Sequence, residues 1–109
     1  MTGVFHDLSE RRSWALHQEV AARLVEHPEL VERARARVTD WLRDPLRHPY
    51  AADWQELLQG DTVILAAALV EVNPRMQALR QASPFAGALD SQTRWRILKR
   101  PELTGHEAG

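Results

Sequence analysis

Histidine is the residue of this chain best suited to proton transfer or metal binding. Five histidines occur, and no two lie three or four positions apart, the spacing that places two imidazoles on one face of a helix. They are His6, His17, His27, His48 and His106. The chain also lacks cysteine and a glycine-rich phosphate loop. The sequence therefore predicts neither a metal site nor a bound cofactor.

His17 differs from the other histidines because it falls within the apolar half of an amphipathic segment. We expect an imidazole at the edge of the core, with one ring nitrogen bonded to the backbone, rather than a catalytic base. The serines at positions 13, 83 and 91 lack the glycine-flanked elbow that exposes a nucleophile. The sequence therefore predicts that the protein is not an enzyme.

The segment 94–100 carries side chains suited to contact with another macromolecule. Tryptophan and arginine are the residue types most enriched at interface hot spots, and here a tryptophan lies between two arginines. Core packing is the favoured interpretation of Trp95, and partner contact is the alternative. The predicted partner-binding residues are Phe85, Arg94, Trp95, Arg96, Lys99 and Arg100.

Charge is distributed unevenly although the formal net charge is only −1, a value that argues against a surface wholly committed to nucleic acid. Residues 44–73 hold five acidic and one basic side chain, a net of −4, and residues 74–100 hold six basic and one acidic, a net of +5. The basic segment could bind a phosphate backbone, an acidic protein surface or the acidic middle of the same domain. The last of these three is favoured.

Helical signals dominate the chain, and strand alternation is missing. Prolines, glycines and capping residues divide it into segments at about 9–27, 28–44, 50–58, 61–72, 74–82 and 92–99. The segment at 61–72 is apolar on almost every side, which is typical of a buried helix. We therefore predict an all-α fold, a compact bundle of five to six short helices around a central apolar helix at about 61–72.

The 109 residues suit one domain. We expect it at 9–100, with a flexible N-terminus at 1–8 and a disordered tail at 101–109. The longest apolar run, 63–70, is too short to cross a membrane, so no membrane association is predicted. The absence of cysteine fits a cytoplasmic location. A homo-oligomer is a further possibility, because the apolar face of the first helix is wide.

Three stretches carry a resemblance to a known group of proteins: SWALHQEVAARL, HPELVERARARVTDWL and LRQASPFAGALDSQTRWRIL. Over most of residues 9–100 the chain resembles small, uncharacterised, all-helical bacterial proteins associated with toxin–antitoxin loci. The resemblance implies an antitoxin-like protein that binds and masks a toxin and has no chemistry of its own.

The expected function is therefore a protein-binding module, an antitoxin-like neutraliser or an accessory subunit of a partner protein. The alternative is a small nucleic-acid-binding or regulatory domain that uses the same basic residues against phosphate. Salt dependence distinguishes the two, because affinity for nucleic acid falls steeply with salt.

Overall fold

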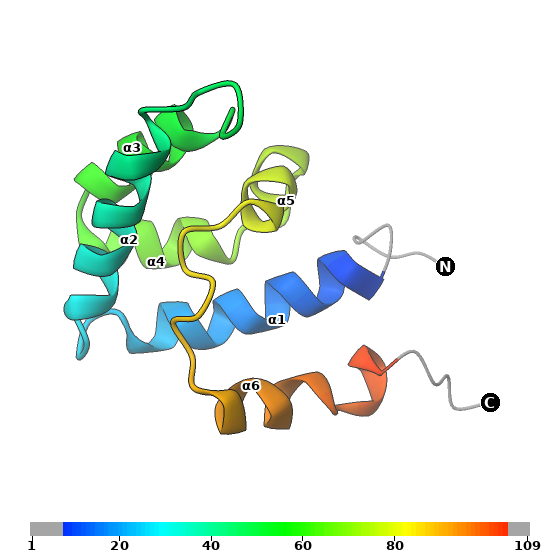
Figure 1. Cartoon of the computed structure of the whole chain (residues 1–109). Coiled ribbons are helices and arrows are strands. Elements are labelled where there is room, and N and C mark those ends of the chain that lie inside the picture. The colour runs from blue at the N-terminus through cyan, green and yellow to red at the C-terminus, as the bar shows by residue number, and fades with distance from the viewer. Residues whose placement is uncertain (1–7, 105–109) are drawn as a thin grey trace.

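A computed structural model describes residues 8–104 of the chain, which form helices and no strand (Figure 1). The elements are α1 (Leu8–Arg23), α2 (Glu29–Trp41), α3 (Ala51–Gln59), α4 (Thr62–Leu69), α5 (Pro74–Gln81), α6 (Ser91–Leu98) and the short 3₁₀ helix η1 (Pro101–Leu103). The predicted all-α bundle of short helices is confirmed. Most of the flexible N-terminus expected at 1–8 and part of the tail expected at 101–109 lie outside the described residues, at 1–7 and 105–109; Leu8 instead begins α1, and Pro101–Leu103 form η1.

Three of the helices begin at capping side chains that the sequence predicts. Asp61, Asn73 and Asp90 each accept a hydrogen bond from a backbone N–H of the first turn, at 2.7 to 2.8 Å. Each bond satisfies a donor that has no partner inside the helix. These polar caps therefore fix where α4, α5 and α6 begin.

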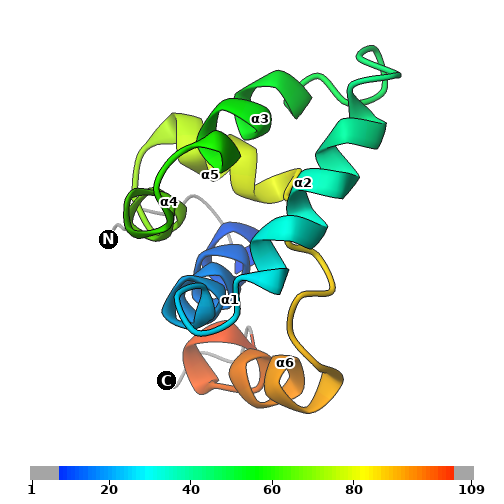
Figure 2. The same ribbon diagram turned by 90° about the vertical axis from the view of Figure 1, so that its left-hand side faces the viewer.

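The centre of the bundle is α1, which contacts α4, α5, α6 and η1, whereas α2 packs mainly on α3. Figure 2 shows α1 between α6 on one side and the layer of α4 and α5 on the other. The prediction that the apolar segment at 61–72 forms the centre is wrong. Val63 and Ile64 are 66% and 68% exposed, because α4 packs against the domain through only one face.

The apolar face of α1 is covered within the chain. Ala15, Val20 and Leu24 on this face are buried by the surrounding helices. The wide free face that suggested a homo-oligomer is therefore absent. The predicted domain end at residue 100 is also too early, since Leu103 of η1 is 3% exposed and its carbonyl accepts a 2.7 Å bond from Nε of Arg12.

Side chains from distant elements complete the C-terminal ends of the short helices. The last carbonyls of a helix have no partner within it. At the end of α4, Nη1 of Arg80 donates to the carbonyls of Leu69 and Glu71 at 3.1 and 2.7 Å, and the Trp14 indole donates to that of Val70 at 3.0 Å. These bonds tie α1 and α5 to the end of α4.

The ends of α3 and α5 are completed in the same way. Arg35 of α2 donates from Nε and Nη2 to the carbonyl of Leu58, at 3.0 and 2.8 Å. The buried Trp54 indole of α3 donates to the carbonyl of Leu79 in α5, at 3.1 Å. Each of these bonds links two helices, so the polar ends of the helices contribute to tertiary structure.

We predict that Leu65→Asp destabilises the domain by several kcal/mol, because Leu65 is 1% exposed and the substitution buries a charge away from water. Ile64→Asp is the matched control, since Ile64 lies next to it on the same helix and is 68% exposed. We expect the control to change stability by about 1 kcal/mol or less. Chemical denaturation measures the free energy of unfolding of both variants, and equal values would contradict the burial of Leu65 in the core.

We predict that Arg80→Met destabilises the domain by about 2–4 kcal/mol, because the carbonyls of Leu69 and Glu71 lose their donor and the bond to Leu69 is buried. Arg75→Met is the control. Its exposed guanidinium lies 3.6 Å from Asp53, a surface pair worth about 0–1 kcal/mol. Urea melts of the two variants give the comparison, and an Arg80 variant as stable as the control contradicts the capping role.

Candidate functional site

The helix α6 carries three of the six predicted partner-binding residues and presents three different stripes, because side chains four residues apart share a face. Thr93 and Ile97 are buried, at 6% and 3% exposure, where α6 packs on α1. Arg94 and Leu98 line a cavity. Trp95 belongs to the third stripe and faces solvent. The predicted residues on α6 are thus divided between two surfaces.

The structure corrects the favoured interpretation of Trp95 as a core residue. Its side chain is 66% exposed, because burial of Thr93 and Ile97 turns position 95 outward. The Nζ atom of Lys99 lies 5.7 Å from the centroid of the Trp95 ring, within the range of a cation–π interaction. Trp95 and Lys99 therefore form one exposed aromatic and cationic pair.

Phe85 does not belong to this surface, and its predicted role as an exposed anchor is wrong. It is 5% exposed and meets Trp54 edge to face, with ring centroids 6.0 Å apart and an interplanar angle of 72°. An aromatic pair of this geometry is favourable beyond the area it buries. Phe85 therefore fixes the linker between α5 and α6 to the core, and part of its ring lines the cavity.

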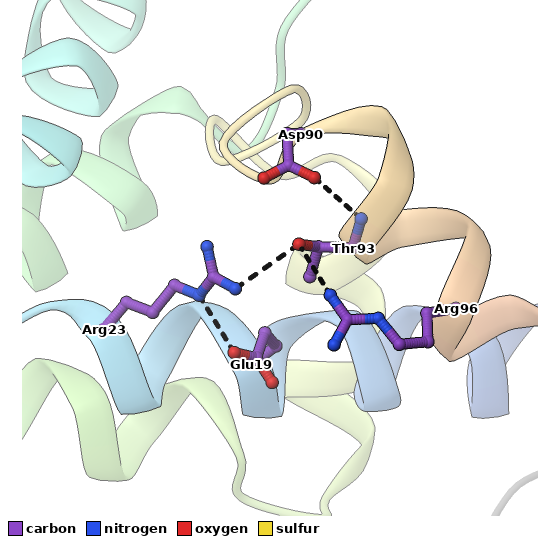
Figure 3. Close-up of polar contacts among 5 residues, drawn as sticks. All are labelled: Glu19, Arg23, Asp90, Thr93 and Arg96. Carbon is purple, nitrogen blue, oxygen red and sulfur yellow. Dashed lines mark hydrogen bonds and ion pairs between the residues drawn. The ribbon is translucent and has the colours of Figure 1, made fainter.

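Arg96 turns toward α1 and belongs to the contacts that seat α6 (Figure 3). Its Nη2 donates to Oγ1 of Thr93 at 3.3 Å, and Nη2 of Arg23 reaches the same oxygen at 3.5 Å. Arg23 is held in turn by Glu19, at 2.9 Å. The carboxylate of Asp90 accepts the Thr93 backbone N–H, and this bond lowers the pKa of Asp90. These contacts orient the start of α6 on α1.

The basic segment does not pair with the acidic middle of the domain in the way that the sequence favours. Among the described residues, the only ion pair between the two segments joins Arg75 to Asp53, at 3.6 Å between Nη2 and Oδ1. Arg94, Lys99 and Arg100 make no ion pair with a described carboxylate. Their charges remain available to a ligand or partner.

A cavity of about 530 Å³ lies beside this helix. It is enclosed by α1, the loop between α2 and α3, the linker from α5 to α6, and α6 itself. Nη1 of Arg37 fixes the linker from α2 by donating to the carbonyl of Ala86, at 2.7 Å. The linker turns at Gly87, whose φ of +84° is a conformation that side chains other than glycine rarely adopt. The cavity is therefore bounded by anchored backbone.

His17 and Ser83 meet at the wall of the cavity. Nδ1 of His17 lies 2.7 Å from the carbonyl of Ser13, and Nε2 lies 2.8 Å from Oγ of Ser83. Because a carbonyl only accepts, Nδ1 carries the proton, and Nε2 accepts the Ser83 hydroxyl. Ser83 Oγ in turn accepts the backbone N–H of Phe85, at 3.0 Å. The expected backbone bond of His17 is confirmed.

The order of donors in this pair matches the serine and histidine of hydrolytic enzymes, but its electrostatics differ. Burial lowers the pKa of His17 to about 4, against the opposing effect of the Ser13 carbonyl and with a further lowering by the nearby charge of Arg80. An efficient general base has a pKa near the working pH. The pair is therefore better suited to joining α1 to the α5–α6 linker than to accepting a proton from a nucleophile.

Sequence reasoning singled out His17 but missed the residues that surround it. Ser83 follows α5 in a proline-containing break, and no pattern in the sequence indicates that this break crosses α1. Arg80 reads as an exposed charge, yet it is 3% exposed, because Met76 and Leu79 on the same face draw that face into the core. A signal for this burial was present in the sequence, because one hydrophobic residue lies four positions before Arg80 and another lies immediately before it.

Comparison with known protein families, with curated proteins and with solved structures finds no match for this chain. The described residues contain no group of three or more histidine, cysteine or acidic side chains that could hold a metal ion. None of the described helices is both long enough and apolar enough to cross a lipid bilayer. The chemistry of the site is therefore inferred from its own residues.

We predict that His17 makes stability depend on pH between about 6.5 and 4. The unfolded imidazole binds a proton near its ordinary pKa, and the folded one does so only near pH 4. The unfolded state thus binds more protons in this window, so stability falls as the pH is lowered, by about 3 kcal/mol in all. Denaturation curves recorded across this range measure the effect.

The variant that tests this origin is His17→Gln, which removes the titrating group and should flatten the dependence over the same window. His27→Gln changes an exposed histidine at the end of α1 and should keep the wild-type slope. A His17 variant with the wild-type slope would assign the pH dependence to other groups.

Proposed function

We propose that the protein is a binding module for a partner protein, an antitoxin-like neutraliser or an accessory subunit with no chemistry of its own. The single observation that carries this proposal is the exposed side chain of Trp95, 66% accessible at the outer stripe of α6. Burying an indole at an interface removes a large apolar area from water and often makes a hot spot. The ammonium group of Lys99 lies 5.7 Å from the centroid of that ring, and most of the side chain remains accessible to a partner.

Charge complementarity indicates an acidic surface on the partner. The sequence from Ser91 to Pro101 contains four basic residues and no acidic one. Lys99 lies over the exposed ring and Arg100 follows it in the chain, and neither makes an ion pair with a described carboxylate. Carboxylates on a partner around a pocket for the indole would therefore match this surface in both charge and polarity.

The resemblance to antitoxin-like proteins supports the same class of function, because a neutralising protein acts through a surface. The lack of cysteine is consistent with work in a reducing cytoplasm. Nucleic acid is the alternative ligand for the basic residues, and it is an outcome of the experiment that follows.

The proposal is tested by comparing capture of the partner by two triple variants. Trp95→Ala/Lys99→Ala/Arg100→Ala removes the proposed surface. Leu46→Ala/Arg33→Ala/Arg43→Ala removes one exposed apolar side chain and two cations elsewhere, so the change in net charge is the same.

The chain is used as bait in an extract of its source cells, with and without nuclease, and the captured partner is purified for calorimetry. We expect one acidic protein whose capture resists nuclease and whose affinity falls at least about tenfold with the first variant. The control should bind as the wild type does, and both variants should keep the wild-type melting temperature within a few degrees.

Two outcomes contradict the proposal. Equal binding by both triple variants would remove α6 from the interface. Capture that disappears with nuclease and declines steeply with salt would assign the basic residues to phosphate contacts instead.

A further inference from the structure

We propose that the cavity between α1, α6 and the α5–α6 linker is a binding site for a small organic anion with an oxyanion head group and an apolar body. This site is separate from the outer stripe of α6, and the proposal does not depend on a partner protein. The observations that carry it are the size of the cavity, the positive sign of the four arginines that line it and a buried guanidinium nitrogen of Arg80 that has no hydrogen-bond partner.

The cavity has the size and lining of a small-molecule site. Its volume of about 530 Å³ falls in the range of about 300–1,000 Å³ found for ligand pockets. The apolar part of the wall comprises Leu16, Val20, Trp41, Tyr50, Phe85 and Leu89. The Trp41 ring is held flat against His48, with centroids 5.0 Å apart and an interplanar angle of 7°. A planar apolar body therefore finds a preformed surface.

All of the charged residues that line the cavity are cationic. They are Arg12, Arg47, Arg80 and Arg94, and no aspartate or glutamate is among the lining residues. Four arginines around one hollow repel one another, and an anion placed among them lowers that repulsion. Arginine also presents a planar fork of donors that fits carboxylate and phosphate oxygens. The charge distribution thus selects for a negatively charged ligand.

The four arginines divide into two held by the fold and two that remain free for a ligand. Arg12 donates Nε to the carbonyl of Leu103, and Arg80 donates Nη1 to the end of α4. Arg47 and Arg94 are exposed at the mouth, on opposite elements, and make no ion pair with a described carboxylate. Their guanidinium groups are therefore the ones available to bind an oxyanion.

Arg80 adds a buried charge that no described carboxylate pairs with. It is 3% exposed, and its Nη2 has no hydrogen-bond partner. Burial lowers the pKa of Arg80, and the charge of Glu10 acts in the opposite direction. Leaving a buried cation uncompensated is costly. An anion bound in the cavity that Arg80 lines would offset part of that cost.

The neutral state of His17 fits an anion site that includes an apolar body. Its Nε2 accepts a hydrogen bond from Ser83, so the imidazole adds no charge to the wall at neutral pH. Ser83 and Ser13 lie with it along the lining. The head group is thus met by the exposed Arg47 and Arg94, and Arg12 and Arg80 are the other charged residues of the wall.

The direct test is calorimetric titration of the full chain with four probes. Phenyl phosphate and benzoate carry an anionic head on the same ring, benzyl alcohol is the neutral counterpart, and inorganic phosphate lacks the ring. We expect at least one of the two ring anions to bind at least about tenfold more tightly than benzyl alcohol and than inorganic phosphate. The stronger of the two identifies the head group as phosphate or carboxylate.

A matched pair of variants locates the binding site. Arg47→Gln/Arg94→Gln removes the two cations at the mouth of the cavity, and we expect the affinity for the ring anion to fall by at least about tenfold. Arg43→Gln/Arg100→Gln removes two exposed cations that do not line the cavity, and it should bind the probe as the wild type does. The indole N–H signal of Trp41 in a proton–nitrogen NMR spectrum should shift with the probe.

Several outcomes overturn the proposal. They are equal affinity for benzyl alcohol, equal affinity for inorganic phosphate, no binding of either ring anion at millimolar concentration, and equal losses in the two arginine variants. The triple variant Trp95→Ala/Lys99→Ala/Arg100→Ala separates this site from the partner-binding surface, because it should keep the affinity for the probe. If the cavity does not bind the probes, the proposed partner-binding function is unaffected. If the chain does not bind a partner through Trp95, the proposed anion site is unaffected.

Discussion

The packing of the helices depends on the buried guanidinium of Arg80, which donates hydrogen bonds at the C-terminal end of a neighbouring helix. Arg80 is carried by α5 and donates to the last carbonyls of α4, while the Trp14 indole of α1 donates to the carbonyl between them. Helices of eight residues satisfy only about half of their own carbonyls, since the last four have no partner. Short helices packed this closely therefore require donors from neighbouring elements.

This requirement explains why a charged side chain occupies the centre of the domain. A water molecule could serve an exposed helix end, but the end of α4 lies against α1 and α5. Arginine reaches two carbonyls at once from one side chain. The consequence is a permanent positive charge inside the bundle, and that charge helps to keep the neighbouring His17 neutral. One of the four positive charges in the wall of the cavity thus follows from the way in which α4 ends.

Local features of the fold were predictable from the sequence. Asp61, Asn73 and Asp90 mark helix starts because their caps act within three residues, a range that the sequence displays directly. Burial was less predictable. The segment 61–72 is apolar on nearly every side, yet Val63 and Ile64 remain exposed, because the number of neighbours that a helix receives depends on the tertiary arrangement.

The predicted binding site was also only partly right, because the burial of its residues depends on the tertiary arrangement. Composition indicated that the segment of α6 could bind a partner, but Phe85 was expected at the partner surface and Trp95 was expected in the core, and each occupies the opposite environment. The register of α6 is set by Thr93 and Ile97 against α1, and this contact is absent from any local pattern. The cavity was beyond prediction, since it joins residues from four separate segments.

The contacts at the start of α6 connect the two surfaces that this helix presents. Thr93 receives Arg23 from α1 and Arg96 from its own helix, so the helix is oriented by a few polar bonds and by the burial of Ile97 (Figure 3). Arg94 and Trp95 are neighbours in the chain and diverge by about 100° around the helix axis. A rotation of α6 that moves the indole therefore moves the cation at the cavity mouth by the same angle. The wall of the cavity and the outer stripe thus share one short helix, whose position is fixed by the contacts of Thr93 and Ile97, which belong to neither surface.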